Sequence, residues 1–138
     1  SAFSTDPAAR SRIEKLAMDA VRKAEESRGC TVFDVSDQKC GWDLTSHPPV
    51  VNGIQPAARH IEVKGRIKGA ATITVTRNEI LYSLNKPEDF ILAIVEFTGD
   101  DTHRAHYLRQ PFQREPDFGV TSVNYDFAEL LARADAPR

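Results

Sequence analysis

The chain has 138 residues, of which 41% are hydrophobic and 28% are charged, and its formal net charge is −2. This composition is typical of a globular protein, and the near-neutral charge excludes a global attraction to polyanions, so a nucleic-acid partner would need a local cationic patch or a bound metal. No run of about 18 apolar residues is present, so we expect no membrane-spanning helix.

The length predicts a single domain over residues 1–138, which could have been excised from a larger protein. Cys30 and Cys40 lack the spacing of a redox or zinc motif, so we interpret them as two reduced thiols; a disulfide between them is the alternative. The polar start of the chain does not resemble a secretory signal. These features favour a cytoplasmic location.

The first predicted element is a long helix. Thr5, Asp6 and Pro7 indicate its start, because a capping side chain precedes a proline at the first helical position. An apolar stripe at helical spacing then extends toward Gly29, which is suited to the position after a helix end. Glu25 lies at the edge of this stripe, near the end of the helix.

Strands follow. Residues 30–35 and 42–45 are rich in β-branched and aromatic residues and predict the first two strands. Residues 46–58 contain three prolines and an Asn-Gly pair, which predicts an exposed loop. Residues 59–66 and 70–75 predict two further strands.

Thr76 and Glu79 have the spacing of a capping box and predict a helix that continues to residue 84. Residues 90–97 form the most apolar run and predict a central strand that is buried on both faces. An edge strand is predicted over residues 104–109, a short extension over 120–123 and a final helix over 126–134. This order predicts an α/β fold, with a mixed sheet flanked by helices.

Acidic side chains occur in two of the predicted strands. In residues 59–66, Glu62 and Lys64 share one face, opposite the apolar face. If this strand pairs with residues 42–45, Asp43 lies close to Glu62, and two adjacent carboxylates repel each other unless a cation or a proton is shared. A hard divalent metal commonly occupies such an oxygen cluster. The alternative is a solvated Glu62–Lys64 pair, with Asp43 capping a turn.

Residues 41–43 (Gly-Trp-Asp) and 62–64 (Glu-Val-Lys) resemble the motif of the PD-(D/E)XK nuclease superfamily. Together with residues 35–36 and 76–79 they are similar to the NO VEIN C-terminal domain family. That family has no known function and occurs attached to large helicases and in restriction or phage-defence proteins. The resemblance covers roughly residues 17–97 and implies a helix-strand-strand-strand-helix-strand core.

The resemblance implies a metal-dependent phosphodiesterase or nuclease that acts on nucleic acid, with DNA favoured over RNA, as an accessory to a helicase or a defence system. Asp43, Glu62 and the Val63 carbonyl would bind Mg²⁺ or Mn²⁺. Lys64 would act on the attacking water and on the transition state, and Glu25 would act from the helix side. The competing hypothesis is a catalytically inactive module of the same fold that binds nucleic acid or docks a protein.

Several cations lie near the motif strand. Arg59, Arg66, Lys68 and Arg77 are predicted to contact a nucleic-acid backbone, although a solvated charged face would have the same pattern. Glu79 also has two interpretations: it contacts the site or nucleic acid, or it only completes its capping box.

Overall fold

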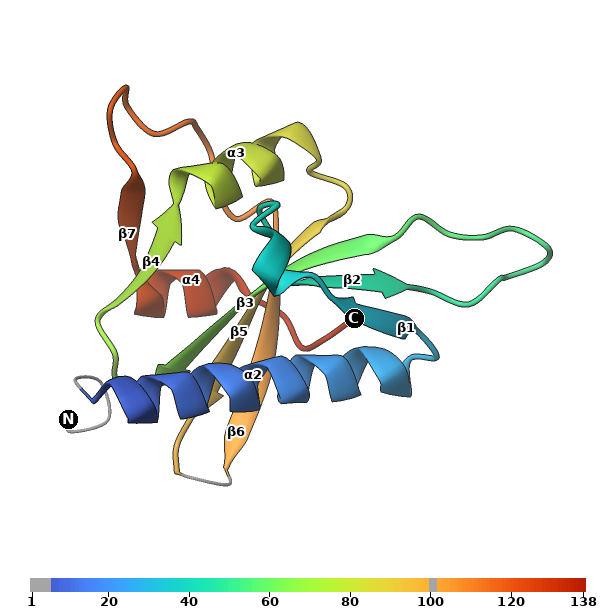
Figure 1. Cartoon of the computed structure of the whole chain (residues 1–138), viewed down its shortest axis with the longest axis horizontal. Helices are drawn as coiled ribbons and strands as arrows, with labels where there is room; N and C mark the ends of the chain where they lie inside the picture. Colours follow the sequence, from blue (N-terminus) through green and yellow to red (C-terminus); the bar gives the residue numbers. More distant parts are fainter. Residues whose placement is uncertain (1–5, 100–101) are drawn as a thin grey trace.

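The structure, a computed structural model, describes residues 6–99 and 102–138 and contains a five-stranded sheet between two layers (Figure 1). Its helices are α2 (Pro7–Ser27), η1 (Ser36–Gln38, a 3₁₀ turn), α3 (Arg77–Asn85) and α4 (Phe127–Arg133). Its strands are β1 (Thr31–Asp34), β2 (Leu44–His47), β3 (Arg59–Ile67), β4 (Thr72–Thr76), β5 (Phe90–Phe97), β6 (His103–Arg109) and β7 (Ser122–Asp126).

The five-stranded sheet is mixed. Its order is β1-β2-β3-β5-β6, and β3 pairs with β5 in parallel while the other neighbours are antiparallel. The parallel pair requires a crossover, which contains α3. The mixed α/β sheet flanked by helices is therefore confirmed. One feature was not predicted: β4 leaves the main sheet and pairs with β7 in a separate two-stranded sheet.

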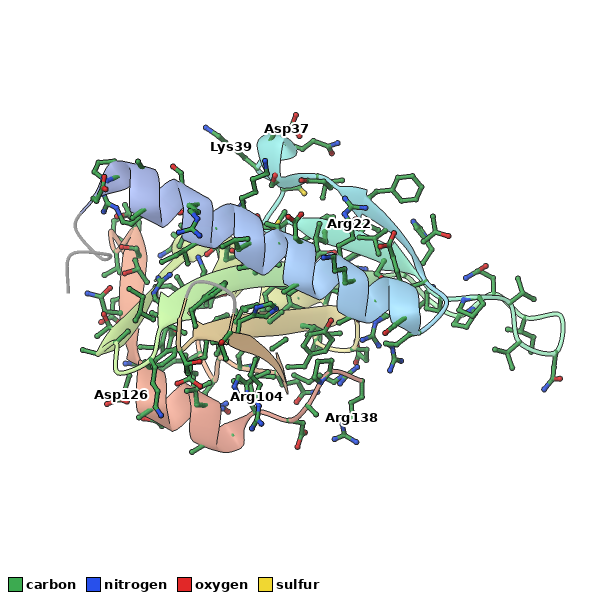
Figure 2. The ribbon with its side chains drawn as sticks, turned by 90° about the horizontal axis from the view of Figure 1, so that it is seen from below. Arg22, Asp37, Lys39, Arg104, Asp126 and Arg138 are labelled. Atoms are coloured by element: carbon green, nitrogen blue, oxygen red, sulfur yellow. The ribbon has the colours of Figure 1, made fainter. Side chains whose placement is uncertain are left out.

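Helix α2 covers one face of the main sheet, as Figure 2 also shows. The Asp6 side chain caps the helix by accepting a hydrogen bond from the N–H of Ala8 at 3.0 Å, and Pro7 occupies its first turn. Thr5, the other residue of the predicted helix start, lies outside the described residues. The chain turns away at Gly29, whose φ of +84° is in the left-handed region that favours glycine.

Strand β5 explains how two cores form on one sheet. Successive side chains of a strand point to opposite faces, and all residues of β5 except Glu96 are buried. Ile91, Ala93 and Val95 belong to the core beneath α2. The alternate side chains pack on the other face against residues of α3, α4, β4 and β7. The prediction of a central strand buried on both faces is thus confirmed.

Residues 48–58 form an arm that extends from the end of β2 and β3, as both views show (Figures 1 and 2). Val51 and Ile54 exchange two backbone hydrogen bonds of 2.9 Å each around the Asn-Gly turn. The Gln55 amide also donates to the Pro48 carbonyl at 2.7 Å. The segment is exposed, as predicted, but residues 46 and 47 belong to β2.

Cys30 and Cys40 are both free thiols. None of the helices that the structure describes combines the length and the apolar character that crossing a membrane would require.

Candidate active site

The candidate site lies where β3 loses its antiparallel partner. The Asp43 N–H donates to the Ile61 carbonyl at 2.9 Å, and the Val63 N–H donates to Asp43 Oδ2 at 2.9 Å. The Asp43 side chain therefore takes the place of the next backbone carbonyl and ends the pairing of β2 with β3. Because the N–H and C=O of one strand residue point to the same side, the Val63 carbonyl also faces this open edge.

The Gly-Trp-Asp run has a structural reason. Gly41 has a φ of +105°, and a Cβ there would lie 3.0 Å from Tyr82 Cβ, so a side chain would be strained and crowded. Trp42 stacks on His60, with ring centroids 4.4 Å apart, and its Nε1 donates to Thr45 Oγ1 at 2.8 Å. These contacts fix the approach to β2 and with it the position of Asp43.

Glu62 and Lys64 lie on the β3 face that looks toward α3. The side chains of Asp43 and Glu62 line the same pocket, and each carboxyl group affects the ionisation of the other. Lys64 Nζ lies 3.3 Å from Glu62 Oε2 and 3.1 Å from Glu79 Oε1, and its side chain is only 14% exposed. The site therefore pairs one ammonium group with two carboxylates and places Asp43 in the same pocket, and we call Asp43, Glu62, Lys64 and Glu79 the acidic cluster.

Glu79 is held by the start of α3. Its Oε1 accepts a hydrogen bond from the Thr76 N–H at 2.9 Å, while Thr76 Oγ1 accepts one from the Glu79 N–H at 3.2 Å. The capping box that the sequence predicts is therefore present, and the same carboxylate also contacts Lys64. Glu79 therefore does more than complete its capping box, since the cap also places its carboxylate beside Lys64.

The ionisation of the cluster follows from its burial and its charges. Burial, together with the carboxylates of Asp43 and Glu79, raises the pKa of Glu62 well above its usual value despite the nearby Lys64. Burial likewise raises the pKa of Asp43, although its hydrogen bond from Val63 opposes the shift. The pKa of Glu79 is lowered: burial acts against this, but Lys64 and the other donors outweigh it. Lys64 alone does not neutralise the cluster, so a proton or a further cation would stabilise it.

The donor set fits a hard divalent cation with few protein ligands. Two carboxyl groups that line one pocket and a backbone carbonyl at the same strand edge are oxygen donors of the kind that Mg²⁺ accepts, with water completing its shell. Within residues 6–99 and 102–138, no three His, Cys, Asp or Glu side chains are arranged so that they could hold a metal ion together. Any such ion would therefore depend on Asp43, Glu62 and the Val63 carbonyl.

A pocket of about 320 Å³ gives access to the cluster, and helix α2 forms its other wall. Glu14 of α2 lines this pocket opposite Asp43 and Glu62. The helix can approach because residue 65 is glycine: a Cβ there would lie 2.9 Å from Ile13 Cγ2 and 3.0 Å from Ala17 Cβ. Sequence reasoning missed Glu14, and its signal was Gly65, since a glycine inside a strand can mark a close approach of another element.

Glu25 does not join this cluster. It is fully buried on the α2 face of the sheet, where Arg59 Nε donates to it at 2.7 Å and the Tyr107 hydroxyl donates at 2.8 Å. The pKa of Glu25 is lowered, because these bonds outweigh the effect of burial. The acid that α2 brings to the pocket of Asp43 and Glu62 is Glu14, not the predicted Glu25.

The four predicted contact cations are also separated. Arg59 is held by Glu25 and by the Arg138 carbonyl. Arg77 Nη1 lies 3.3–3.4 Å from three carbonyls of residues 116–120. Arg66 lines the pocket, and Lys68 is exposed at the end of β3. Of the four cations, only Arg66 and Lys68 lie at the open edge of β3.

Comparisons with known proteins agree with this fold. The family model for the C-terminal region of the protein NO VEIN matches residues 13–108. No curated protein sequence matches the chain significantly. Among solved structures, Hjc, a Holliday junction resolvase from the archaeal hyperthermophile Archaeoglobus fulgidus, is similar with a TM-score of 0.56 and 10% identity, and the match covers 88% of each chain. At this identity the likeness shows the fold alone, and it confirms the predicted nuclease-like fold.

Proposed function

The chain belongs to the NO VEIN C-terminal family, and we propose that it is a metal-dependent nuclease whose active site is the acidic cluster. The observation that carries the proposal is that the Asp43 and Glu62 carboxyl groups line one pocket at the open edge of β3, with Lys64 Nζ 3.3 Å from Glu62 Oε2. Two carboxyl groups with raised pKa values in one pocket destabilise a fold, so a role in binding a cation gives them a reason to be there.

Asp43, Glu62 and the Val63 carbonyl would hold Mg²⁺ or Mn²⁺. The ion would polarise the phosphoryl group and lower the pKa of an attacking water. Lys64 extends from the same strand and can donate a hydrogen bond to a phosphoryl oxygen as negative charge develops there. Glu79 holds the Lys64 ammonium in place. From the opposite wall, Glu14 can accept a hydrogen bond from a water that enters the pocket.

DNA is the proposed substrate, supported by the likeness in fold to a resolvase of Holliday junctions. We further propose that residues 1–138 act as one domain of a larger protein, as an accessory to a helicase or a phage-defence system in the cytoplasm, where its two thiols would stay free. One observation favours the second candidate, an inactive module for nucleic-acid binding or docking: Lys64 is already paired with two carboxylates.

Asp43→Asn and Lys64→Ala separate the two candidates. Asp43→Asn removes a ligand charge but keeps its shape, so Mn²⁺ binding measured by calorimetry and cleavage of a DNA substrate should be lost together. Lys64→Ala should retain or tighten Mn²⁺ binding, because a competing positive charge is gone, while cleavage falls at least tenfold. Asp37→Asn in the exposed turn η1 is the matched control and should change neither. Unchanged Mn²⁺ affinity in Asp43→Asn would favour the inactive module.

A further inference from the structure

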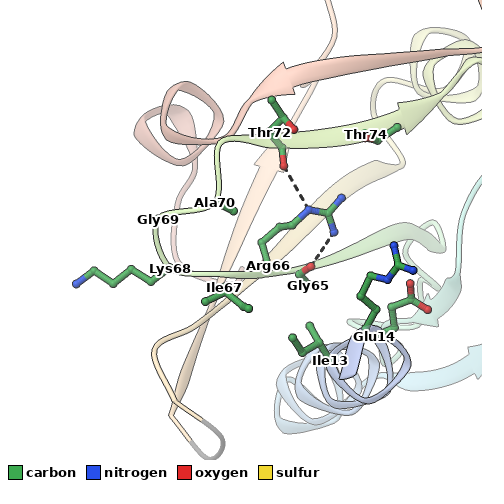
Figure 3. A pocket seen from close by; sticks show the side chains of 11 residues that line it. Ile13, Glu14, Gly65, Arg66, Ile67, Lys68, Gly69, Ala70, Thr72 and Thr74 are labelled. Carbon is green, nitrogen blue, oxygen red and sulfur yellow. Dashed lines mark hydrogen bonds between the residues drawn. The ribbon is translucent and has the colours of Figure 1, made fainter. Parts of the chain in front are cut away.

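A groove continues from the candidate active site along the open edge of β3. The pocket beside Asp43 and Glu62 shares Glu14, Gly65 and Arg66 with a second, larger cavity of about 580 Å³. This second cavity lies between α2 and the edges of β3 and β4 (Figure 3). The turn at residues 68–69 connects these two strands. We call the two cavities together the edge groove.

Arg66 spans the middle of the edge groove. Its Nη1 donates to the Gly65 carbonyl at 2.7 Å and its Nε to the Thr72 carbonyl at 3.3 Å, so the guanidinium group bridges β3 and β4 (Figure 3). The side chain is half-buried, and none of the ion pairs found among the described residues includes it. Its hydrogen-bond partners are neutral carbonyls, and the Glu14 carboxylate interacts with it without forming an ion pair, so its charge remains available to an anion.

The lining of the larger cavity suits a backbone rather than bases. Arg10 and Lys68 are two further cations among the residues that line it, against the single carboxylate of Glu14. Its lining includes the small residues Gly65, Gly69 and Ala70, and none of its lining residues is aromatic. Phosphates can therefore approach the strand edges, whereas bases find no ring on which to stack.

We propose that the edge groove binds the sugar-phosphate backbone of one nucleic-acid strand, with Arg66 contacting a phosphate next to the one that lies at Lys64. Residues two apart on a strand share a face and lie about 6.6 Å apart along it, so Lys64 and Arg66 present successive cations to the strand. Recognition is independent of sequence. The position of the strand rests on the proposed active site, but the binding itself does not require cleavage.

The test measures binding of a fluorescent single-stranded oligonucleotide of about 8 nucleotides by anisotropy, in a chelator so that cleavage is absent. For the four cations Arg10, Lys64, Arg66 and Lys68, log K should fall against log salt with a slope of about −3. Arg66→Gln should weaken binding about tenfold and reduce the slope by about 0.7, and a homopolymer and a mixed sequence should bind within about threefold of each other. Arg104→Gln, on β6, is the matched control and should bind like the wild type.

Lys68→Gln and Arg10→Gln provide a second measurement at exposed positions, where folding is not at risk, and each should also reduce the slope. The proposal is overturned if Arg66→Gln and both exposed variants bind like Arg104→Gln, or if a mononucleotide binds as tightly as the strand. Binding as expected without cleavage in Mn²⁺ would leave the groove assigned while the nuclease proposal fails. Cleavage that is unaffected by all three groove variants would support the nuclease proposal and overturn the proposal for the groove.

Discussion

Lys64 Nζ lies 3.1 Å from the same Glu79 oxygen that accepts the capping hydrogen bond at the start of α3. The position of the lysine is therefore linked to the first turn of a helix. The two contributions of Glu79 can be separated, because glutamine can also complete a capping box but carries no charge.

Glu79→Gln should lower the affinity for Mn²⁺ several-fold, because Lys64 would keep Glu62 as its sole carboxylate partner and compete more strongly with the ion. Thr76→Ala should cost about 1 kcal/mol of folding stability through loss of the cap, with the Mn²⁺ affinity unchanged. Calorimetry with Mn²⁺ and urea unfolding of both variants check this. An equal loss of affinity in Thr76→Ala would mean that the position of the helix, not the charge, controls the site.

The folding stability of the metal-free protein should depend on pH through Glu62. Burial and the neighbouring carboxylates raise the pKa of Glu62 in the folded state. Between the unfolded and folded pKa values the folded state binds more protons than the unfolded state, so stability falls as pH rises through this window. Glu62→Gln should flatten the decline and exceed the wild type in stability at about pH 8. Urea unfolding in the presence of a chelator measures this pH dependence, with Glu26→Gln at an exposed position as the control. If the stability of Glu62→Gln declined with pH as steeply as that of the wild type, Glu62 would not be its cause.

Glu25 and Arg59 should act as a structural pair. Glu25→Gln leaves the largely buried Arg59 without its carboxylate and should cost about 3 kcal/mol of folding stability, whereas Tyr107→Phe removes one hydrogen bond and should cost about 1 kcal/mol. At a temperature at which the Glu25→Gln variant is folded, the affinity of this variant for Mn²⁺ should equal that of the wild type. A lower Mn²⁺ affinity in the folded variant would show that Glu25 contributes to the active site.

Gly65→Ala should force α2 away from β3. The added methyl group would lie 2.9 Å from Ile13 Cγ2 and 3.0 Å from Ala17 Cβ, and overpacking of this kind costs about 1–3 kcal/mol. Ile13→Ala removes one of the two clashes, so the double variant should lose less stability than the sum of the single variants. Strict additivity of the unfolding free energies would show that Ile13 and residue 65 are not in contact.

Local patterns were sufficient for most of the helices and strands, and for the expectation that Asp43 approaches the strand of Glu62. The alternation around Glu62 and the strand character of both runs predicted that Asp43 and Glu62 would meet, because strand register follows from the apolar face. The spacing of Thr76 and Glu79 likewise predicted the cap of α3.

The remaining features depend on contacts between distant segments. Whether Glu14 or Glu25 reaches the cluster is decided by where α2 crosses β3, and the sequence of the helix alone does not contain that crossing point. Arg59 and Arg77 resemble free cations in the sequence, yet one pairs with Glu25, 34 residues away, and the other reaches carbonyls 39–43 residues away. The pairing of β4 with β7 is hidden in the same way, since each strand alone is a short polar-apolar alternation.

The arrangement of β2, β3 and β5 also has a consequence for the order of folding. The hairpin of β2 and β3 closes a local loop, whereas the parallel pairing of β3 with β5 must wait for α3 to cross between them, and non-local pairing of this kind forms slowly. We therefore expect the carboxyl groups of Asp43 and Glu62 to meet early on the nascent hairpin, while Lys64 gains Glu79 only when α3 docks. During biosynthesis the repulsion between the two acids would precede the contact that fixes the lysine.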